Sequence, residues 1–138
     1  MLPKTKKKLL LVEDEMDMRF FLTTLLKNGG YQIVTARNGK EGLQKANTLQ
    51  PDVILLDVMM PEEGGALMYQ HLKSDPVLAP IPVVILSGVS KRSFLHYLKM
   101  LSAQTGVKIP PPQAYVEKPP EPTILLTILN GMFETGYQ

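Results

Sequence analysis

The sequence of 138 residues predicts an α/β fold, namely a doubly wound, five-stranded parallel sheet in a single domain. The first observation is that short, almost purely apolar runs alternate along the chain with longer segments of helical spacing. The second is the composition of the short runs, because Leu, Ile and Val without alternating polar residues are typical of strands buried on both faces. Strict alternation of such strands with helices indicates right-handed crossovers that cover both faces of the sheet.

Each expected strand is a short apolar run, and each expected helix is the periodic segment that follows it. The strands are expected at Lys8–Val12, Ile33–Ala36, Val53–Leu56, Val83–Leu86 and, with the weakest pattern, Ala114–Val116. The helices are expected at Met16–Asn28, Gly39–Leu49, Ala66–Lys73, Lys91–Gln104 and Thr123–Phe133. Glycines at 29 and 30 end the first helix, and the run from Ser74 to Pro76 stops the third.

The helical spacing predicts which side chains of each helix lie on one side. In chain order these are Phe20, Phe21, Leu25 and Leu26; Leu43 and Ala46; Leu67, His71 and Leu72; Leu95, Leu98 and either Leu101 or Ser102; and Ile124, Leu125, Ile128, Leu129 and Met132.

The composition excludes several classes of protein. There is no cysteine, which rules out disulfides, Cys-ligated metal centres and thiol catalysis, and which fits a cytoplasmic protein. No apolar stretch approaches the roughly 18 residues of a spanning helix, so we expect no membrane association. The net charge of +2 is too small to indicate direct nucleic-acid binding. The basic residues 1–7 are expected to form a solvated N-terminal tail.

Polar side chains stand where four of the expected strands end. Glu13 and Asp14 follow the first, Asp57 ends the third, Ser87 follows the fourth and Lys118 follows the fifth. In parallel sheets, sites form at the carboxyl ends of the strands. Three carboxylates in one cleft repel one another unless positive charge lies among them, and magnesium with oxygen ligands supplies it. With a lysine and a hydroxyl nearby, the set indicates phosphoryl transfer to a carboxylate.

In this order and at these strand ends, the residues resemble a response regulator receiver domain of two-component signalling. The resemblance spans essentially the whole chain and includes the Met-Pro turn from Met60 to Gly65 and Pro119 after the lysine. It implies a flavodoxin-like (βα)5 three-layer sandwich with strand order 2-1-3-4-5. Residues 1–138 would then be a single receiver domain, with residues 134–138 as a C-terminal tail.

The resemblance also implies a role for each site residue. Asp57 would accept a phosphoryl group from a sensor histidine kinase or a phosphotransfer protein. The chain would thus be a regulatory phosphoacceptor that catalyses only its own phosphorylation and dephosphorylation. Ser87 and Lys118 would contact the phosphoryl oxygens. Mg²⁺, with Mn²⁺ as an alternative, would be bound by Asp14, Asp57 and the backbone carbonyl of Met59, with Glu13 acting through water.

Switching is the remaining implication of the resemblance. Tyr115, three residues before the lysine, would move together with Ser87 when phosphorylation adds charge at Asp57. The face formed by the fourth helix, fifth strand and fifth helix would then change shape for a downstream effector or for a homodimer. The peptide bond between Lys118 and Pro119 would be cis.

One segment departs from the family pattern. Residues 106–114 form a proline-rich insertion before the fifth strand. Proline fixes the backbone angle and removes hydrogen-bond donors, so we expect a stiff, extended loop there. Because this loop adjoins the signalling face, we hypothesise a partner surface specific to this chain.

Two other classes of function compete with the phosphoacceptor. A pseudo-receiver would be a binding module that works without phosphorylation, and the intact Asp57 and Lys118 argue against it. A phosphatase or flavin enzyme could share the fold. A dehalogenase-like phosphatase needs a second aspartate two residues after the nucleophile, where Met59 stands, and no glycine-rich phosphate loop follows the first strand.

Overall fold

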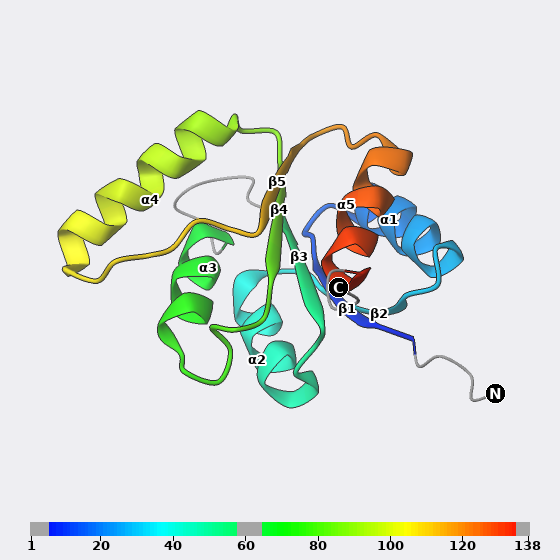
Figure 1. The fold of residues 1–138 in the computed structure, drawn as a ribbon, viewed down its shortest axis with the longest axis horizontal. Helices are drawn as coiled ribbons and strands as arrows, with labels where there is room; N and C mark the ends of the chain where they lie inside the picture. The colour runs from blue at the N-terminus through cyan, green and yellow to red at the C-terminus, as the bar shows by residue number, and fades with distance from the viewer. Residues whose placement is uncertain (1–5, 58–64, 135–138) are drawn as a thin grey trace.

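The protein is a three-layer α/β sandwich, described by a computed structural model over residues 6–57 and 65–134 (Figure 1). The elements in chain order are β1 (Lys8–Val12), α1 (Met16–Asn28), β2 (Gln32–Ala36), α2 (Gly39–Leu49), β3 (Val53–Asp57), α3 (Gly65–Ser74), β4 (Val83–Ser87), α4 (Lys91–Thr105), β5 (Ala114–Glu117) and α5 (Pro122–Glu134). The five strands are parallel in the order β2-β1-β3-β4-β5, which confirms the predicted fold and strand order.

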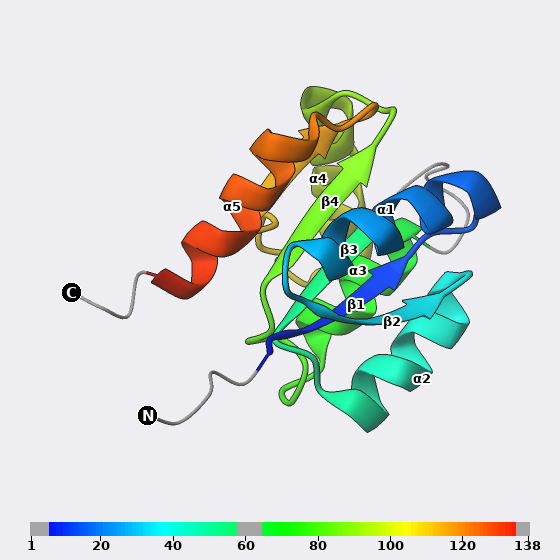
Figure 2. The same ribbon diagram turned by 90° about the vertical axis from the view of Figure 1, so that its right-hand side faces the viewer.

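The sheet separates two hydrophobic cores. Helices α1 and α5 cover one face, and α2, α3 and α4 cover the other (Figures 1 and 2). Successive strand residues point to opposite faces, so both halves of each apolar run are used. In β3, for example, Val53 and Leu55 pack under α1 and α5, whereas Ile54 and Leu56 pack on the other side. All four side chains are fully buried, which explains why the sequence of this strand has no polar alternation.

The inward face of α1 differs from the predicted one. Phe20 is 74% exposed and Phe21 is 43% exposed, while Leu22 and Leu26 are fully buried. Because each residue turns the helix by about 100°, Phe20 lies on the opposite side of the helix from Leu22. Just after the helix, Gly29 lies close to α5, since a Cβ at this position would lie 2.7 Å from Leu126.

Two further helices expose residues that the helical spacing places on one side with buried ones. Leu67 of α3 is 41% exposed, His71 is exposed, and Ile124 of α5 is 54% exposed. Each helix lies on a sheet through a narrow stripe, so apolar residues at its flanks stay in contact with solvent. The other predicted inward residues are buried or half-buried.

Helix caps define how the chain leaves the strands at the carboxyl edge. Glu15 accepts a hydrogen bond from the backbone N–H of Met18 at 2.7 Å, and Asn38 does the same for Glu41 at 2.9 Å. Ser90 caps α4 by accepting from the N–H of Ser93 at 3.1 Å. These caps satisfy backbone groups that a helix end leaves unpaired. They keep the connections β1–α1, β2–α2 and β4–α4 short.

The proline-rich segment returns from the far end of α4 to the start of β5 (Figure 1). As predicted, residues 106–113 form neither helix nor strand, and β5 begins at the next residue. Gly106 adopts φ of 74° and ends α4 in the left-handed conformation. Ile109 is buried, its N–H donates to Ser102 Oγ at 3.1 Å, and the Tyr69 hydroxyl donates to the carbonyl of Pro110 at 2.6 Å.

No helix among residues 6–57 and 65–134 is long and apolar enough to cross a membrane.

Part of the expected N-terminal tail contacts the body of the protein. The Lys7 ammonium lies 5.0 Å from the centre of the Phe133 ring, and the Lys7 carbonyl accepts from the N–H of Gln32 at 2.9 Å.

Candidate functional site

The carboxyl edge of the sheet brings together the polar residues that the sequence places at strand ends. Val12 of β1 is paired with Leu56, Asp57 with Leu86 and Ser87 with Glu117. Each of β3 and β4 therefore extends one residue beyond its neighbour, β1 or β3, and all these strands end at one edge of the sheet. Asp57 and Ser87 are the last residues of β3 and β4, while Glu13 and Lys118 are the first residues after β1 and β5.

Lys118 lies between two buried carboxylates. Its ammonium is 3.0 Å from Glu13 Oε1 and 3.2 Å from Asp57 Oδ2. Glu13 is 1% exposed and Asp57 is 8% exposed. Charges removed from water in this way are costly unless they are paired. One ammonium shared between two carboxylates leaves the buried cluster with excess negative charge.

The second carboxylate oxygen of Asp57, Oδ1, is where the excess negative charge of the cluster lacks a partner. Asp57 Oδ1 is buried and has no hydrogen-bond or ion-pair partner among the described residues. By contrast, Glu13 Oε2 accepts from the N–H of Glu15 at 3.1 Å. A buried carboxylate oxygen without a donor is destabilising, and it marks a place where a cation or another donor is expected.

The electrostatics of Asp57 agree with this geometry. Burial raises the pKa of Asp57 to about 8, and the Glu13 carboxylate acts in the same direction, while Lys118 opposes both. Burial alone would lower the pKa of Lys118, but its interactions with Glu13 and Asp57 outweigh that effect and leave it raised. The lysine therefore stays charged, and Asp57 is the group that lacks stabilisation.

The three acidic residues form a set of oxygen donors that suits a hard divalent cation. Glu13, Asp14 and Asp57 each offer a carboxylate oxygen, and these oxygens lie within 4.8 Å of one another. Asp14 is exposed, which gives the cluster one side open to solvent. Several carboxylates plus water are the ligands that magnesium prefers. Met59 and the turn from Met60 to Gly64 fall outside the described residues.

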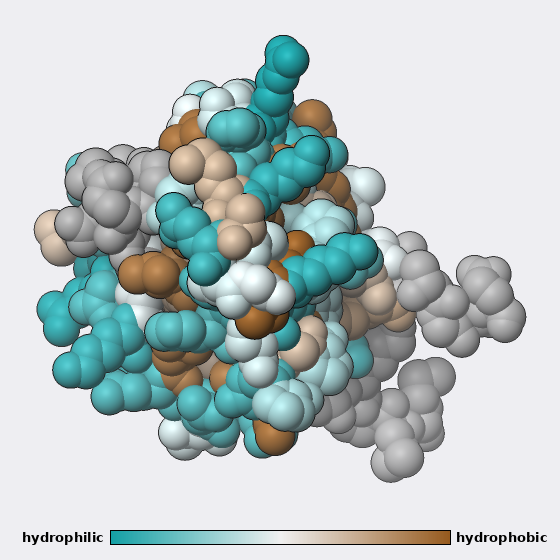
Figure 3. All heavy atoms as spheres, turned by 90° about the vertical axis from the view of Figure 1, so that its left-hand side faces the viewer, coloured by the Kyte–Doolittle hydropathy of each residue, from teal (hydrophilic) through white to brown (hydrophobic). Residues whose placement is uncertain are grey.

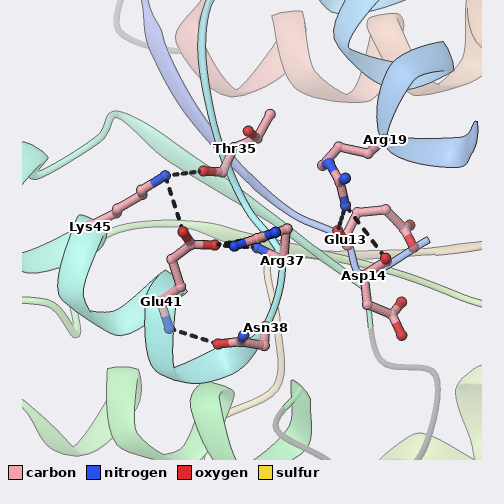
Figure 4. A network of polar contacts seen from close by, with 8 residues as sticks. All are labelled: Glu13, Asp14, Arg19, Thr35, Arg37, Asn38, Glu41 and Lys45. Carbon is pink, nitrogen blue, oxygen red and sulfur yellow. Dashed lines mark hydrogen bonds and ion pairs between the residues drawn. The ribbon is translucent and has the colours of Figure 1, made fainter. Parts of the chain in front are cut away.

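Arg19 supports the acidic loop in a way that the sequence did not reveal. Its guanidinium donates to the backbone carbonyl of Glu13 at 2.9 Å and to that of Asp14 at 3.4 Å (Figure 4). These contacts leave the Asp14 carboxylate available to a ligand while they hold the loop in place. The signal in the sequence is weak, because an arginine in the first turns of a helix is ordinarily a solvated residue.

Ser87 and Tyr115 both contact the residue Val89 in the β4–α4 loop. The buried Ser87 hydroxyl accepts from the Val89 N–H at 3.0 Å, and the Tyr115 hydroxyl donates to the Val89 carbonyl. The Tyr115 ring packs on Phe94 of α4, with ring centres 5.5 Å apart. Burial raises the pKa of Tyr115, so the hydroxyl remains a donor at neutral pH. A shift of the Ser87 loop therefore reaches Tyr115 and α4 directly.

Lys118 is oriented by its backbone. Its N–H donates to the carbonyl of Ser87 at 2.9 Å, and its peptide bond to Pro119 is cis. The hydrogen bond continues the pairing of β4 with β5 by one residue and directs the lysine side chain toward Glu13 and Asp57.

Comparison with known proteins identifies relatives of the chain. The model of the response regulator receiver domain matches residues 9–110, so Tyr115 and Lys118 lie beyond the matched part. Protein PilH of Pseudomonas aeruginosa is 28% identical over 125 residues, which are 91% of this chain and 96% of that protein. The alkaline phosphatase synthesis transcriptional regulatory protein PhoP of Bacillus subtilis is 40% identical over 75 residues, 54% of this chain and 31% of its relative.

Solved structures agree with the sequence matches. The chemotaxis response regulator CheY4 of Vibrio cholerae superposes with a TM-score of 0.74 and 27% identity, covering 92% of this chain and 98% of that one. The chain spans about a third or less of the length of most of the curated relatives that it matches.

Proposed function

Because the chain belongs to the response regulator receiver domain family, we propose that it is a phosphoacceptor of two-component signalling, with Asp57 as the acceptor. The observation that carries the proposal is the state of Asp57. It is a buried carboxylate at the end of a central strand, and its Oδ2 is 3.2 Å from Lys118. Its Oδ1 has no partner among residues 6–57 and 65–134, and two acids lie beside it. A purely structural aspartate would be fully satisfied by hydrogen bonds.

The proposed reaction transfers a phosphoryl group from a phosphohistidine to Asp57. A carboxylate oxygen of Asp57 attacks phosphorus, a P–O bond forms and the P–N bond breaks. The imidazole leaves with the bonding electron pair and takes a proton from solvent. The Lys118 ammonium, which contacts Asp57 Oδ2 before the reaction, would remain beside the aspartyl phosphate. There it offsets the negative charge of the phosphoryl group.

The donor set fits a divalent metal as cofactor. Glu13, Asp14 and Asp57 are the residues that would hold it, and we propose Mg²⁺ or Mn²⁺ because all three ligands are carboxylates. Bound there, the ion would neutralise phosphoryl oxygens as a Lewis acid. Arg19 keeps the Asp14 backbone in position, and the buried Glu13 is held by Glu15 and Lys118.

The signal would leave the site through Ser87 and Tyr115. We propose that the Ser87 hydroxyl turns from Val89 to the new phosphoryl oxygens, which frees the loop that Tyr115 contacts. The Tyr115 ring then repacks against Phe94, so that α4 and β5 change together. This is a shift between two packings of the same residues.

The partners follow from the reaction. A sensor histidine kinase or a phosphotransfer protein would supply the phosphoryl group, and an effector would recognise the changed face of α4, β5 and α5. We further propose that residues 1–138 form one receiver domain. In support, the described strands form one sheet, with one hydrophobic core on each of its faces.

Labelling of the whole chain with radioactive acetyl phosphate tests the proposal. The wild type should incorporate label with added Mg²⁺ and lose that ability with a chelator, whereas Asp57→Asn should not incorporate label. Asp17→Asn is the matched control, because Asp17 is an exposed acid in the first turn of α1. A folded wild type that takes no label, or an Asp57→Asn variant that still does, would overturn the proposal and favour a pseudo-receiver.

A further inference from the structure

A groove runs between α4 and the proline-rich segment, away from the acidic cluster. It has a volume of about 560 Å³. One face of α4 forms its first wall, and the second wall belongs to the insertion that distinguishes this chain. The lining residues are Arg92, Leu95, His96, Leu98, Lys99 and Ser102 from α4, with Lys108, Ile109 and Pro111 opposite.

The floor of the groove is apolar and firmly held. Leu98 and Ile109 are buried in the same core, and Leu95 packs against it. Hydrogen bonds from the Ile109 N–H to Ser102 and from Tyr69 to the Pro110 carbonyl fix the insertion against α4 and α3. The lining of α4 extends from residue 92 to residue 102, which is about 15 Å of helix. The groove is thus a preformed site long enough for several consecutive side chains.

Among the residues that the structure describes along the groove, the charged side chains are all basic. Between Gly88 and Val116 the sequence has no Asp or Glu, whereas it has the cations Lys91, Arg92, Lys99 and Lys108. The last three of these line the groove. Figure 3 views the molecule from the α4 side and shows apolar patches surrounded by hydrophilic side chains. The chain as a whole is nearly balanced, with 15 basic and 13 acidic residues, so this concentration is local.

We propose that the groove binds an acidic segment of a partner protein, in which apolar side chains are flanked by carboxylates. The apolar side chains would enter between Leu95 and Ile109, and the carboxylates would pair with Arg92, Lys99 and Lys108. The inference rests on the proposed function, which already gives α4 to an effector, and it deepens that function by naming the chemistry of the bound segment and by adding the insertion as the second wall of its site.

Charge decides between this occupant and two others. A second copy of the chain, related by twofold symmetry, would bring the same cations face to face, which is repulsive. A nucleic acid would satisfy the cations, but its phosphate backbone offers nothing to the apolar floor. A protein segment with both acids and apolar anchors matches the rim and the floor together.

Selection of short random peptides displayed on phage against the whole chain tests the proposal, in buffer without Mg²⁺ or phosphodonor. Enriched peptides should contain an excess of Asp and Glu around two or more apolar residues. Their affinity, measured by fluorescence anisotropy, should fall about tenfold for the double variant Lys99→Glu, Lys108→Glu and should weaken with added salt. Replacement of the apolar peptide residues by Ser should also abolish binding.

Lys40→Glu, an exposed lysine in the first turn of α2, is the matched control and should bind the peptides as the wild type does. Thermal unfolding checks that all variants are folded. Acetyl phosphate labelling of the double variant should be unchanged, which separates failure of this proposal from failure of the phosphoacceptor.

Four outcomes would overturn the inference. These are no enrichment of acidic peptides, equal affinity for the double variant, tight binding of a DNA duplex that the double variant loses, and a wild-type dimer that the double variant dissociates.

Discussion

Two carboxylates of this protein each lie close to a lysine, and yet their acidities change in opposite directions. Asp57 Oδ2 is 3.2 Å from Lys118, and Glu41 Oε2 is 3.6 Å from Lys45. The pKa of Asp57 is raised to about 8, chiefly by burial. The pKa of Glu41 is lowered, chiefly by the hydrogen bond that it accepts from the Arg37 N–H. A nearby lysine therefore does not decide the state of a carboxylate, whereas its access to water and to donors does.

The environment of Glu41 shows what a satisfied structural acid looks like. It lies near the start of α2, accepts from the Arg37 N–H at 2.6 Å, and donates its own N–H to Asn38 at 2.9 Å (Figure 4). This reciprocal pattern resembles a capping box. At Asp57 the part of the chain that the structure describes supplies one ammonium, one repelling carboxylate and no donor to Oδ1. An acid left unsatisfied in this way is a candidate for function.

The largest expected effect comes from removal of the buried lysine. Lys118→Met leaves the Glu13 carboxylate buried without a counter-charge, and we expect a loss of about 3 kcal/mol in the free energy of unfolding at neutral pH. Lys45→Met is the control in the exposed cluster and should lose only a small part of that. Urea unfolding of both variants provides the measurement. Equal losses would show that burial does not separate the two clusters.

Asp57→Asn is expected to raise the free energy of unfolding, whereas Lys118→Met lowers it. The folded pKa is about 8 against an ordinary value of 3.8, so between these pH values the folded chain holds a proton that the unfolded chain has released. At this site, stability is therefore fully present below pH 3.8 and is lost as pH rises through 8. Without metal, Asp57→Asn should be more stable than the wild type at pH 8 by on the order of 2 kcal/mol.

The pH dependence makes that prediction specific. Thermal unfolding at a series of pH values should show the advantage of Asp57→Asn shrinking toward pH 4. Asp17→Asn, on the exposed surface, should follow the wild type throughout. An advantage that is constant with pH would mean that the gain comes from packing and not from the charge of Asp57.

Binding of magnesium should stabilise the folded wild type by somewhat less than the gain expected for Asp57→Asn at pH 8. At about ten times its Kd, a ligand that binds only the folded chain adds about 1.4 kcal/mol. Loss of either Asp14 or Asp57 as Asn should remove most of this gain, and Glu41→Gln should leave it intact. Differential scanning fluorimetry with and without MgCl₂ measures the shift. A gain that Glu41→Gln abolishes would place the cation in the exposed cluster.

The contrast between the two clusters also explains how far the sequence could lead. The fold, the strand order and the placement of Asp57, Ser87 and Lys118 at the carboxyl ends of their strands or directly after them follow from short apolar runs in a parallel sheet. Residue order alone therefore predicted which groups share one edge. What it could not predict is the burial of Glu13 and its 3.0 Å contact with Lys118, because these depend on how tightly the loops close over the edge.

Helix faces were the weaker part of the prediction. Phe20 and Phe21 were placed with Leu25 and Leu26, yet Phe20 is 74% exposed. Hydrophobicity favours aromatic residues, whereas the buried stripe is set by their angular position on the helix, and it runs through Leu22 and Leu26. The hydrogen bond from the Tyr69 hydroxyl to the Pro110 carbonyl could not be predicted either. It joins residues 41 positions apart, and the insertion that contains Pro110 has no periodic pattern from which its position could be inferred.

The smallest expected effect belongs to Glu41→Gln. Glutamine keeps an acceptor for the Arg37 N–H but loses the charge beside Arg37 and Lys45, which are both accessible to solvent. We expect a fall in Tm of no more than about 2 °C, because exposed ion pairs contribute little. The pKa of Glu41 is lowered in the folded chain, so its contribution is present above the ordinary value of 4.5 and is lost as pH falls. The difference in Tm from the wild type should therefore vanish in acid, and also in high salt at neutral pH. A larger fall in Tm that persists in high salt would show that Glu41 stabilises α2 through its hydrogen bonds. Burial would then be the remaining difference between the environments of Glu41 and Asp57.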